Sequence, residues 1–123
     1  MAKLTRLMII ARALVLDPLK GISEKESYFS AHFLNARNEV NELERKLGIE
    51  LHRERETSAA GNFYTRYTLE DENQARKVVE LFNLKLRVMH LKDQNLEERL
   101  LDEEDIDRAG ALLERRKWLN VGK

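Results

Sequence analysis

Arginine and asparagine side chains recur on one side of the segment from residue 36 to residue 47. The apolar residues of this segment have helical spacing, and they are Ala36, Val40, Leu43 and Leu47. A helix that buries them exposes the opposite side, whose polar residues are Arg37, Asn38, Asn41 and Arg45. Arginine can bind guanine O6 and N7 together, and asparagine can bind adenine N6 and N7. This side therefore carries residue types that read base edges in the major groove of duplex DNA.

Two acidic residues weigh against this interpretation. Glu42 and Glu44 belong to the same predicted helix, and a carboxylate near DNA phosphates is repelled unless it accepts a hydrogen bond from cytosine N4. The alternative is that the exposed side is an ordinary solvated polar face.

In the DNA-binding interpretation the helix enters the groove with its N-terminal half. Arg37, Asn38 and Asn41 then face bases, and Arg45 lies nearer a phosphate.

Two strands are predicted after Gly48, where the apolar spacing changes from helical to alternating. The strands cover about residues 49–56 and 63–69, with the loop SAAGN between them. The arginines of this hairpin are Arg53, Arg55 and Arg66. Arginine binds phosphate in a fork geometry, so these residues are candidates for contacts with the DNA backbone or the minor groove. The alternative is that they pair across the strands with Glu54 and Glu56.

Two further helices are expected before the 36–47 helix. The first should end near Leu16, because Pro18 disfavours helical geometry in the residue that precedes it. The second should open at Ser23, which has capping-box spacing with Glu26, and should run to about residue 34. The chain thus begins with three helices and continues into a hairpin.

The start of the second helix is a further candidate site for a phosphate. Lys25 lies there between Ser23 and Ser27, and the N-terminus of a helix favours anions. The simpler interpretation is that Ser23 only caps the helix.

The order of three helices followed by a hairpin resembles the winged helix-turn-helix domains of the compact phage and prophage type. The matching stretches are VNELERKLGIELHRE, residues 40–54, and YTRYTL, residues 64–69. They correspond to a recognition helix that runs into a charged strand, and to an aromatic strand that closes the wing. The resemblance covers about residues 4–70 and implies a mainly α fold with a small β-hairpin. Such domains usually bind double-stranded DNA, but some serve only as protein-interaction modules.

The chain beyond residue 70 is expected to be helical. Residues 1–70 would form the winged-helix domain, and residues 71–123 a C-terminal helical extension that acts as a dimerisation element. Between residues 71 and 92 the apolar residues form two stripes. The first stripe, which can cover the core of the first domain, is Ala75, Val78, Val79, Phe82 and Leu86. The second stripe, which needs another cover, is Leu81, Leu84, Val88 and Leu91.

This second stripe predicts a homodimer, because a single winged domain covers only one side of the helix. The first helix adds to the apolar surplus through residues off its main stripe, which are Ile9, Ile10 and Leu16. The competing prediction is that a final helix covers the second stripe within one chain, through Leu112, Leu113 and Trp118.

The final helix is itself predicted from its charges. Acidic residues 102–105 would lie in its first turn and basic residues 115–117 in its last, which complements the helix dipole. The acidic run from 97 to 107 can also be interpreted as a docking tail for a basic protein.

Composition and missing motifs exclude several classes of protein. The chain has 22 basic and 22 acidic residues and no cysteine, so it lacks a strong positive field, and a reducing compartment is the simple expectation. The histidines at positions 32, 52 and 90 form no metal-binding motif, and neither a phosphate loop nor a nucleophile elbow is present. We therefore expect no enzyme, no metal and no cofactor. Arg12 interrupts the first apolar run, which favours a folded first helix over an export signal peptide. No apolar stretch is long enough to span a bilayer.

These features predict a cytoplasmic, sequence-specific double-stranded DNA-binding protein, acting as a regulator or accessory factor of a phage or mobile element. The rival prediction is a small phage-type protein that uses a winged scaffold and its acidic C-terminal surface to bind a host protein. The arginine and asparagine face favours DNA. The zero net charge and the acidic segment favour the rival.

Overall fold

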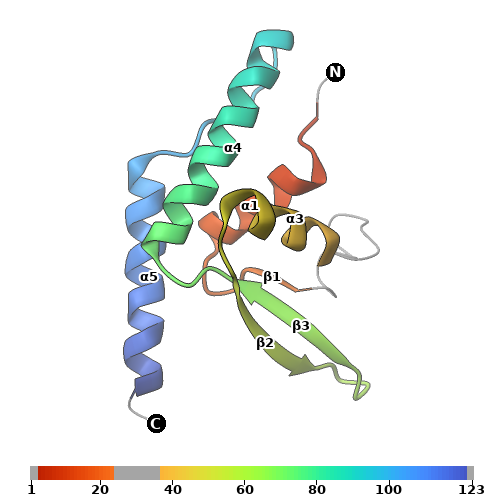
Figure 1. The fold of residues 1–123 in the computed structure, drawn as a ribbon, viewed down its shortest axis with the longest axis vertical. Helices are drawn as coiled ribbons and strands as arrows, with labels where there is room; N and C mark the ends of the chain where they lie inside the picture. The colour runs from red at the N-terminus through yellow and green to blue at the C-terminus, as the bar shows by residue number, and fades with distance from the viewer. Residues whose placement is uncertain (1–2, 24–36, 122–123) are drawn as a thin grey trace.

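The computed structural model describes residues 3–23 and 37–121, and the side chains of that part up to residue 118. It contains four helices, which are α1 (Arg6–Leu16), α3 (Arg37–Leu47), α4 (Glu72–Lys92) and α5 (Glu103–Val121). The strands are β1 (Ile22–Ser23), β2 (His52–Thr57) and β3 (Phe63–Thr68), and they form an antiparallel sheet in the order β1-β3-β2. The described part is thus mainly helical with a small sheet, which lies below α1 and α3 in Figure 1.

Helix α1 lies at the centre of the helical layer. Thr5 caps it by accepting a hydrogen bond from the Met8 amide, and it ends at Leu16 as Pro18 predicted. It contacts α3, α4, α5 and β1, so it is covered on several sides. Ile10, expected to be surplus on this helix, is only 1% exposed and belongs to the core. That expectation was wrong because it assumed that a single face of α1 is packed.

Helix α3 has the predicted stop and half of the predicted buried face, since Leu47 is only partly buried and Ala36 lies outside the described residues. Val40 and Leu43 are fully buried beneath it. Gly48 has a φ of 64°, and the Ile49 amide then donates to the Glu44 carbonyl oxygen at 3.1 Å. A left-handed glycine with this hydrogen bond is a Schellman stop, and it leads the chain directly into β2.

The sheet contains a strand that the sequence did not predict. The β2–β3 hairpin forms as expected, with Arg53 opposite Tyr67, but β1 also pairs with β3 and places Ile22 against Tyr67 from the other side. Ser23, expected to open a helix, lies in β1 and is fully buried. The predicted helix that follows it, from residue 24 to residue 34, falls outside the described residues.

Helix α4 begins at the predicted place, where the Asp71 side chain accepts a hydrogen bond from the Gln74 amide at 2.9 Å. Its first apolar stripe is entirely buried. Together with residues of α1, α3, α5 and β3, this stripe forms one hydrophobic cluster. The core therefore continues across the sequence position at which the extension was expected to begin.

Helix α5 folds back along α4 and is held by three kinds of contact. Asp102 and Asp105 each accept a hydrogen bond from the other's amide at 2.9 Å, which makes a capping box at its start. Gly110 lies against Glu72, where an added Cβ would be only 2.7 Å from the Glu72 Cβ. Arg116 donates to the Thr68 hydroxyl and the Leu69 carbonyl. The last two contacts join α5 to the start of α4 and to the end of β3, whereas the capping box lies within α5 itself.

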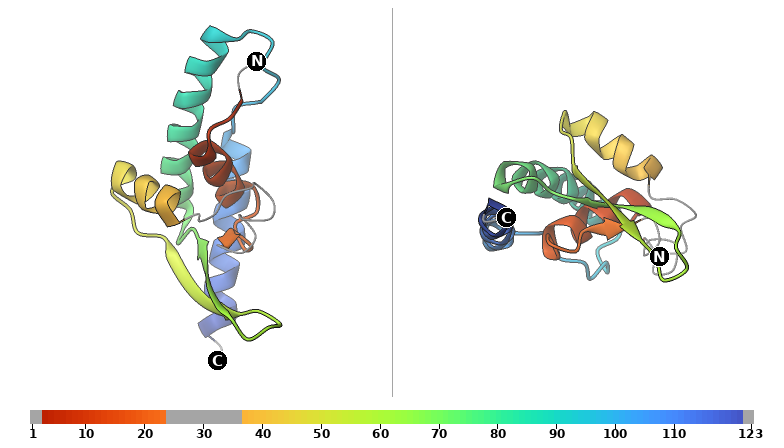
Figure 2. Two further views of the ribbon diagram at one scale, coloured as in Figure 1. Left: turned by 90° about the vertical axis from the view of Figure 1, so that its right-hand side faces the viewer. Right: turned by 90° about the horizontal axis from the view of Figure 1, so that it is seen from below.

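The second apolar stripe of α4 is left uncovered by this arrangement. Leu81 is partly buried, but Leu84, Val88 and Leu91 are 60%, 45% and 84% exposed. Leu113 packs into the core and Trp118 is 71% exposed, so neither side chain covers the stripe. The prediction that α5 would cover it within one chain is therefore wrong. Figure 2 shows that α5 runs beside the N-terminal half of α4, whereas the exposed residues of the stripe lie in its C-terminal half.

Candidate nucleic-acid interface

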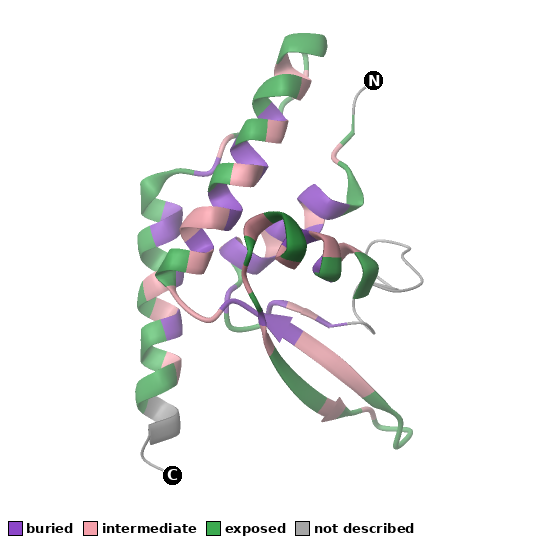
Figure 3. Ribbon diagram, in the orientation of Figure 1, coloured by how far each residue is buried: buried purple, intermediate pink, exposed green. Residues whose placement is uncertain are grey.

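The exposed side of α3 carries four of the predicted DNA-binding residues. Arg37, Asn38, Asn41 and Arg45 are all exposed. The opposite side of the helix is fixed in the core by Val40 and Leu43, which cannot rotate outward without losing their burial. In Figure 3 exposed residues alternate along the α3 ribbon with intermediate and buried ones. The structure thus brings these four residues together on one face.

Glu44 is partly buried, and its carboxylate has partners within the chain. Its carboxylate accepts a hydrogen bond from the Leu51 amide at 2.7 Å, and it binds the Arg53 guanidinium through two bonds of 2.7 and 2.9 Å. The hydrogen bonds from Arg53 are the main reason why the pKa of Glu44 lies below its ordinary value. Glu44 therefore stays ionised, but its charge is compensated by a bidentate partner.

The other acidic residues of α3 are also close to cations. Glu42 lies 3.7 Å from the Lys46 ammonium, one turn further along the helix. Glu39, whose side chain is mostly buried, lies 3.9 Å from the Arg6 guanidinium of α1. The exposed Glu42–Lys46 pair and the long Glu39–Arg6 pair are both weak, but they reduce the negative field beside the arginines and asparagines.

The hairpin arginines have three different environments. Arg53 is held by Glu44 and also lies over the Tyr67 ring, 5.1 Å from its centroid. Arg66 binds the Glu56 carboxylate at 2.6 Å and the Lys20 carbonyl at 2.7 Å. Arg55 lies over the exposed Phe63 ring at 5.1 Å. Pairing across the strands, which the sequence left open, occurs for Arg66, whereas Arg53 takes a partner from α3.

No local pattern in the sequence indicates the contact between Glu44 and Arg53. The two residues are nine positions apart and belong to different elements, and only the turn at Gly48 brings them together. Lys25, the remaining predicted DNA-binding residue, lies outside the described residues. Ser23, proposed with it, is buried in β1.

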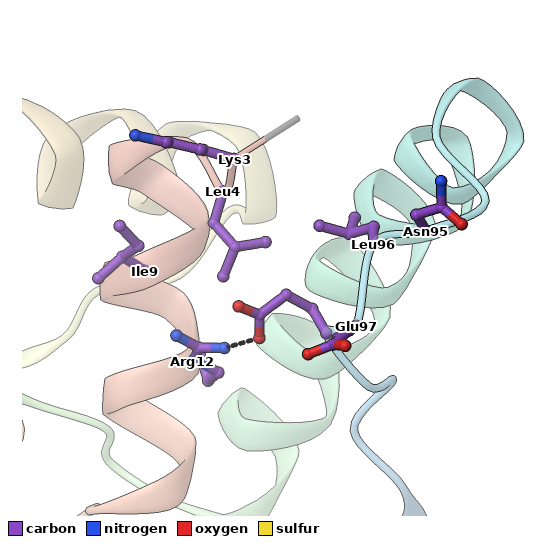
Figure 4. A pocket seen from close by; sticks show the side chains of 8 residues that line it. Lys3, Leu4, Ile9, Arg12, Asn95, Leu96 and Glu97 are labelled. Carbon is purple, nitrogen blue, oxygen red and sulfur yellow. Dashed lines mark hydrogen bonds and ion pairs between the residues drawn. The ribbon is translucent and has the colours of Figure 1, made fainter. Parts of the chain in front are cut away.

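Among the residues that the structure describes, two hollows lie away from the α3 face. The larger, of about 560 Å³, lies between the start of α1 and the loop after α4, and it is lined by Lys3, Leu4, Ile9, Arg12, Asn95, Leu96, Glu97 and Glu98. Figure 4 shows aliphatic side chains on both of its walls and the ion pair from Arg12 to the Glu98 carboxylate, at 2.5 Å, between them. The smaller hollow, of about 420 Å³, lies at the tip of the hairpin. Neither has a set of polar groups that defines a ligand class.

Within residues 3–23 and 37–121 the structure has no group of three or more His, Cys, Asp or Glu side chains suited to a metal ion. Among the helices described there, none is both long enough and apolar enough to cross a membrane.

Comparison with known proteins assigns the chain to a family. A family model described as "Uncharacterised protein PM1773" matches residues 1–108. The chain belongs to the PM1773 family. No curated protein and no solved structure matches it. The match to the PM1773 family extends from α1 through the sheet and α4 into α5, so the whole candidate interface lies inside it.

Proposed function

We propose that the protein is a non-enzymatic, sequence-specific double-stranded DNA-binding protein built on a winged helix-turn-helix. The order of α1, β1, α3 and the β2–β3 hairpin supports the winged arrangement, since a helix with an exposed polar face leads directly into an antiparallel hairpin. In this proposal α3 enters the major groove, and the hairpin lies along the backbone.

One observation carries this proposal. Two arginines and two asparagines lie exposed on α3, while the carboxylate of Glu44 on the same helix is bound by Arg53. The objection that acidic residues would repel phosphate is therefore weaker than the sequence suggests. Asn41 is the best candidate to read an adenine, because it lies one helical turn from Arg37 and Arg45 on either side.

The hairpin contributes less than its three arginines suggest. Arg53 and Arg66 neutralise carboxylates of the same chain, so they add little net positive charge. Arg55 is exposed in β2 and is held against Phe63 without an acidic partner in the described residues. In this proposal Arg55 is the principal hairpin contact with phosphate.

The rival function is a protein-interaction module, in which the same scaffold binds a host protein. It is favoured by the zero net charge and by the acid partners of two hairpin arginines. The exposed aromatic rings of Phe63 and Trp118 also suit a protein partner.

For the DNA-binding proposal, the resemblance to phage-type domains supports a role as a regulator or accessory factor of a mobile element.

Selection from a library of random duplexes tests the proposal and identifies the bound sequence in the same experiment. We expect repeated rounds on immobilised protein to enrich a common motif, which then competes better than a scrambled duplex of the same composition. Arg115→Ala removes one exposed cation from α5, which lies away from α3 in Figures 1 and 2. This variant should enrich the same motif as the wild-type protein. No enrichment by the wild-type protein would contradict DNA reading and leave the protein-interaction function.

A further inference from the structure

The C-terminal half of α4 presents a short apolar stripe with cations beside it. Leu84, Val88 and Leu91 are exposed and follow one another at intervals of four and three residues. With the partly buried Leu81 they occupy the a and d positions of a heptad repeat, the spacing by which one helix pairs with another. Large apolar side chains at adjoining helical positions are usually covered. We propose that this stripe binds an acidic amphipathic helix of a partner protein.

Among the described residues, no element of the same chain covers this stripe. The Asn83 side chain binds both the amide and the carbonyl of Leu101, which sets the start of α5 at the middle of α4. Gly110 then lies against Glu72, near the start of α4. Helix α5 thus runs away from Leu91, and in Figures 1 and 2 the C-terminal end of α4 extends beyond it.

The positions that flank the stripe carry three cations and one anion. Lys85 and Lys92 occupy the e positions of the repeat, and Glu80 and Arg87 occupy the g positions. None of these four side chains forms an ion pair within the described part of the chain. From residue 84 to residue 92 the helix contains no acidic residue. The flanks of the exposed stripe are therefore basic and uncompensated.

An acidic helix matches these charges better than a second copy of the chain does. Contacts at the e and g positions decide which helices pair. Between two copies the contact of Glu80 is attractive and the contact of Lys92 is repulsive, in parallel and in antiparallel pairs alike. A partner with acidic e and g positions makes three of the four contacts attractive. The charges thus favour an acidic partner over the homodimer that the sequence predicted.

A surface of anionic lipid also combines apolar and negative groups, but the stripe suits it less well. Amphipathic helices that lie on membranes have a wide apolar face that carries Trp or Phe beside Leu. This stripe has no aromatic side chain, and Lys77 occupies the d position that precedes it. A short and narrow stripe of this kind is better matched to a single helix.

Two synthetic peptides of opposite charge test this proposal on the full chain without DNA, and the result does not depend on the proposed function. Each peptide has about three heptads with leucine at the a and d positions, and its e and g positions are all glutamate or all lysine. Like charges at these positions keep each peptide from pairing with itself. Fluorescence anisotropy of the labelled peptides should show about tenfold tighter binding of the glutamate peptide. This difference should shrink as salt is added.

Two variants show whether the stripe is the binding site. Leu84→Asp should weaken binding of the glutamate peptide about tenfold or more, because a buried leucine is lost, and it should keep its fold because Leu84 is exposed. Leu19→Asp makes the same change at a half-exposed leucine outside α4 and should leave binding unchanged. Arg87→Glu combined with Lys92→Glu leaves one cation at the four flanking positions, so the protein should then prefer the lysine peptide.

Equal binding of the two peptides, or no binding of the glutamate peptide at about 500 µM protein, would overturn the proposal. Binding that Leu84→Asp leaves intact would overturn it as well, because the peptide would then be held elsewhere, for example by the arginines of α3. Vesicles of phosphatidylserine and phosphatidylcholine test the membrane alternative, and we expect the protein not to sediment with them. Vesicle binding that Leu84→Asp abolishes would assign the stripe to lipid instead of a partner helix.

Discussion

Glu44 shows how a single contact changes the charge of the α3 face. Its two hydrogen bonds with Arg53 and one with the Leu51 amide join the end of α3 to the hairpin. The contact removes one acidic group from the proposed DNA surface, and it also removes one of the arginines expected there. Arg37, Arg45 and Arg55 are the other exposed arginines among the predicted DNA-binding residues.

At the same scale, base reading and phosphate binding are expected to separate between Asn41 and Arg55. Asn41→Ala should weaken binding to the enriched duplex by about 1–3 kcal/mol and reduce its preference over scrambled DNA, because a bidentate contact with a base is lost. Arg55→Ala should weaken both duplexes equally. Fluorescence anisotropy with the two duplexes measures the difference. A variant at Asn41 that retains full preference would show that α3 is not the reader.

The ion pair at the start of α5 predicts a dependence of stability on pH. Hydrogen bonds from Arg99 lower the pKa of Asp105 from 3.8 to about 2, despite the burial of this side chain. Because folding lowers this pKa, the ionised Asp105 carboxylate stabilises the folded chain at pH values above about 4. This stabilisation is lost as the pH falls toward about 2. We expect Asp105→Asn to lower the free energy of unfolding by about 2 kcal/mol at neutral pH.

Urea denaturation of Asp105→Asn and of the wild type at several pH values checks this prediction. The difference between them should be constant above about pH 4 and should shrink below it. Asp107→Asn, at an exposed position of the same helix, is the control and should change the stability little. A difference that stays constant down to about pH 2 would mean that the Asp105 charge does not stabilise the fold.

At the scale of elements, two glycines with left-handed backbones differ in what surrounds them. Gly48 has a φ of 64° and open space around its Cα, whereas a Cβ on Gly21, at a φ of 57°, would lie 2.0 Å from the Tyr67 carbonyl oxygen. Gly48→Ala should cost about 1–2 kcal/mol from backbone strain alone. Gly21→Ala should cost about 3 kcal/mol or more, because β1 must also move away from β3.

Thermal or urea unfolding of the two glycine variants measures this contrast. Equal losses of stability in the two variants would show that the fold does not require the close approach of Gly21 to the backbone of β3.

The elements with local sequence signals were predicted at their observed places. Pro18 ends α1, Gly48 ends α3 and Asp71 begins α4, and each acts through its own backbone or side chain. Strand β1 has two residues and no periodicity of its own, since its pairing partner lies on β3, more than forty residues along the chain. Ile10 was misplaced for a related reason, because three other helices determine what covers α1.

The residues of the candidate site likewise fall into those that a local pattern predicts and those whose partners depend on tertiary contacts. The exposed residues of α3 follow from the helical period, because the buried residues Val40 and Leu43 define the opposite side. The partners of Arg53 and Arg66 depend on tertiary contacts with Glu44 and Lys20, which no local pattern contains. Sequence reasoning thus placed the exposed polar face of α3, and it left open the pairing of the hairpin arginines, which tertiary contacts decide.

At the scale of the whole molecule, one core supports two separate outer surfaces. Residues of α1 and α4 pack together in a single hydrophobic cluster that also holds α3 and α5. The exposed polar face of α3 and the second apolar stripe of α4 are both presented by this cluster, so each can be altered by substitutions at exposed residues without unfolding the protein.

The dependence of DNA affinity on salt concentration tests the central claim most directly. With two arginine–phosphate contacts in each chain, Arg45 and Arg55, the logarithm of the association constant should fall with the logarithm of salt concentration with a slope of about −2 per bound chain. Anisotropy titrations of the enriched duplex between about 50 mM and about 200 mM salt measure this slope. A steep slope that becomes about one unit shallower in Arg55→Ala would support DNA binding through this face. An absence of binding at micromolar protein in low salt, or an affinity that does not change with salt, would contradict it.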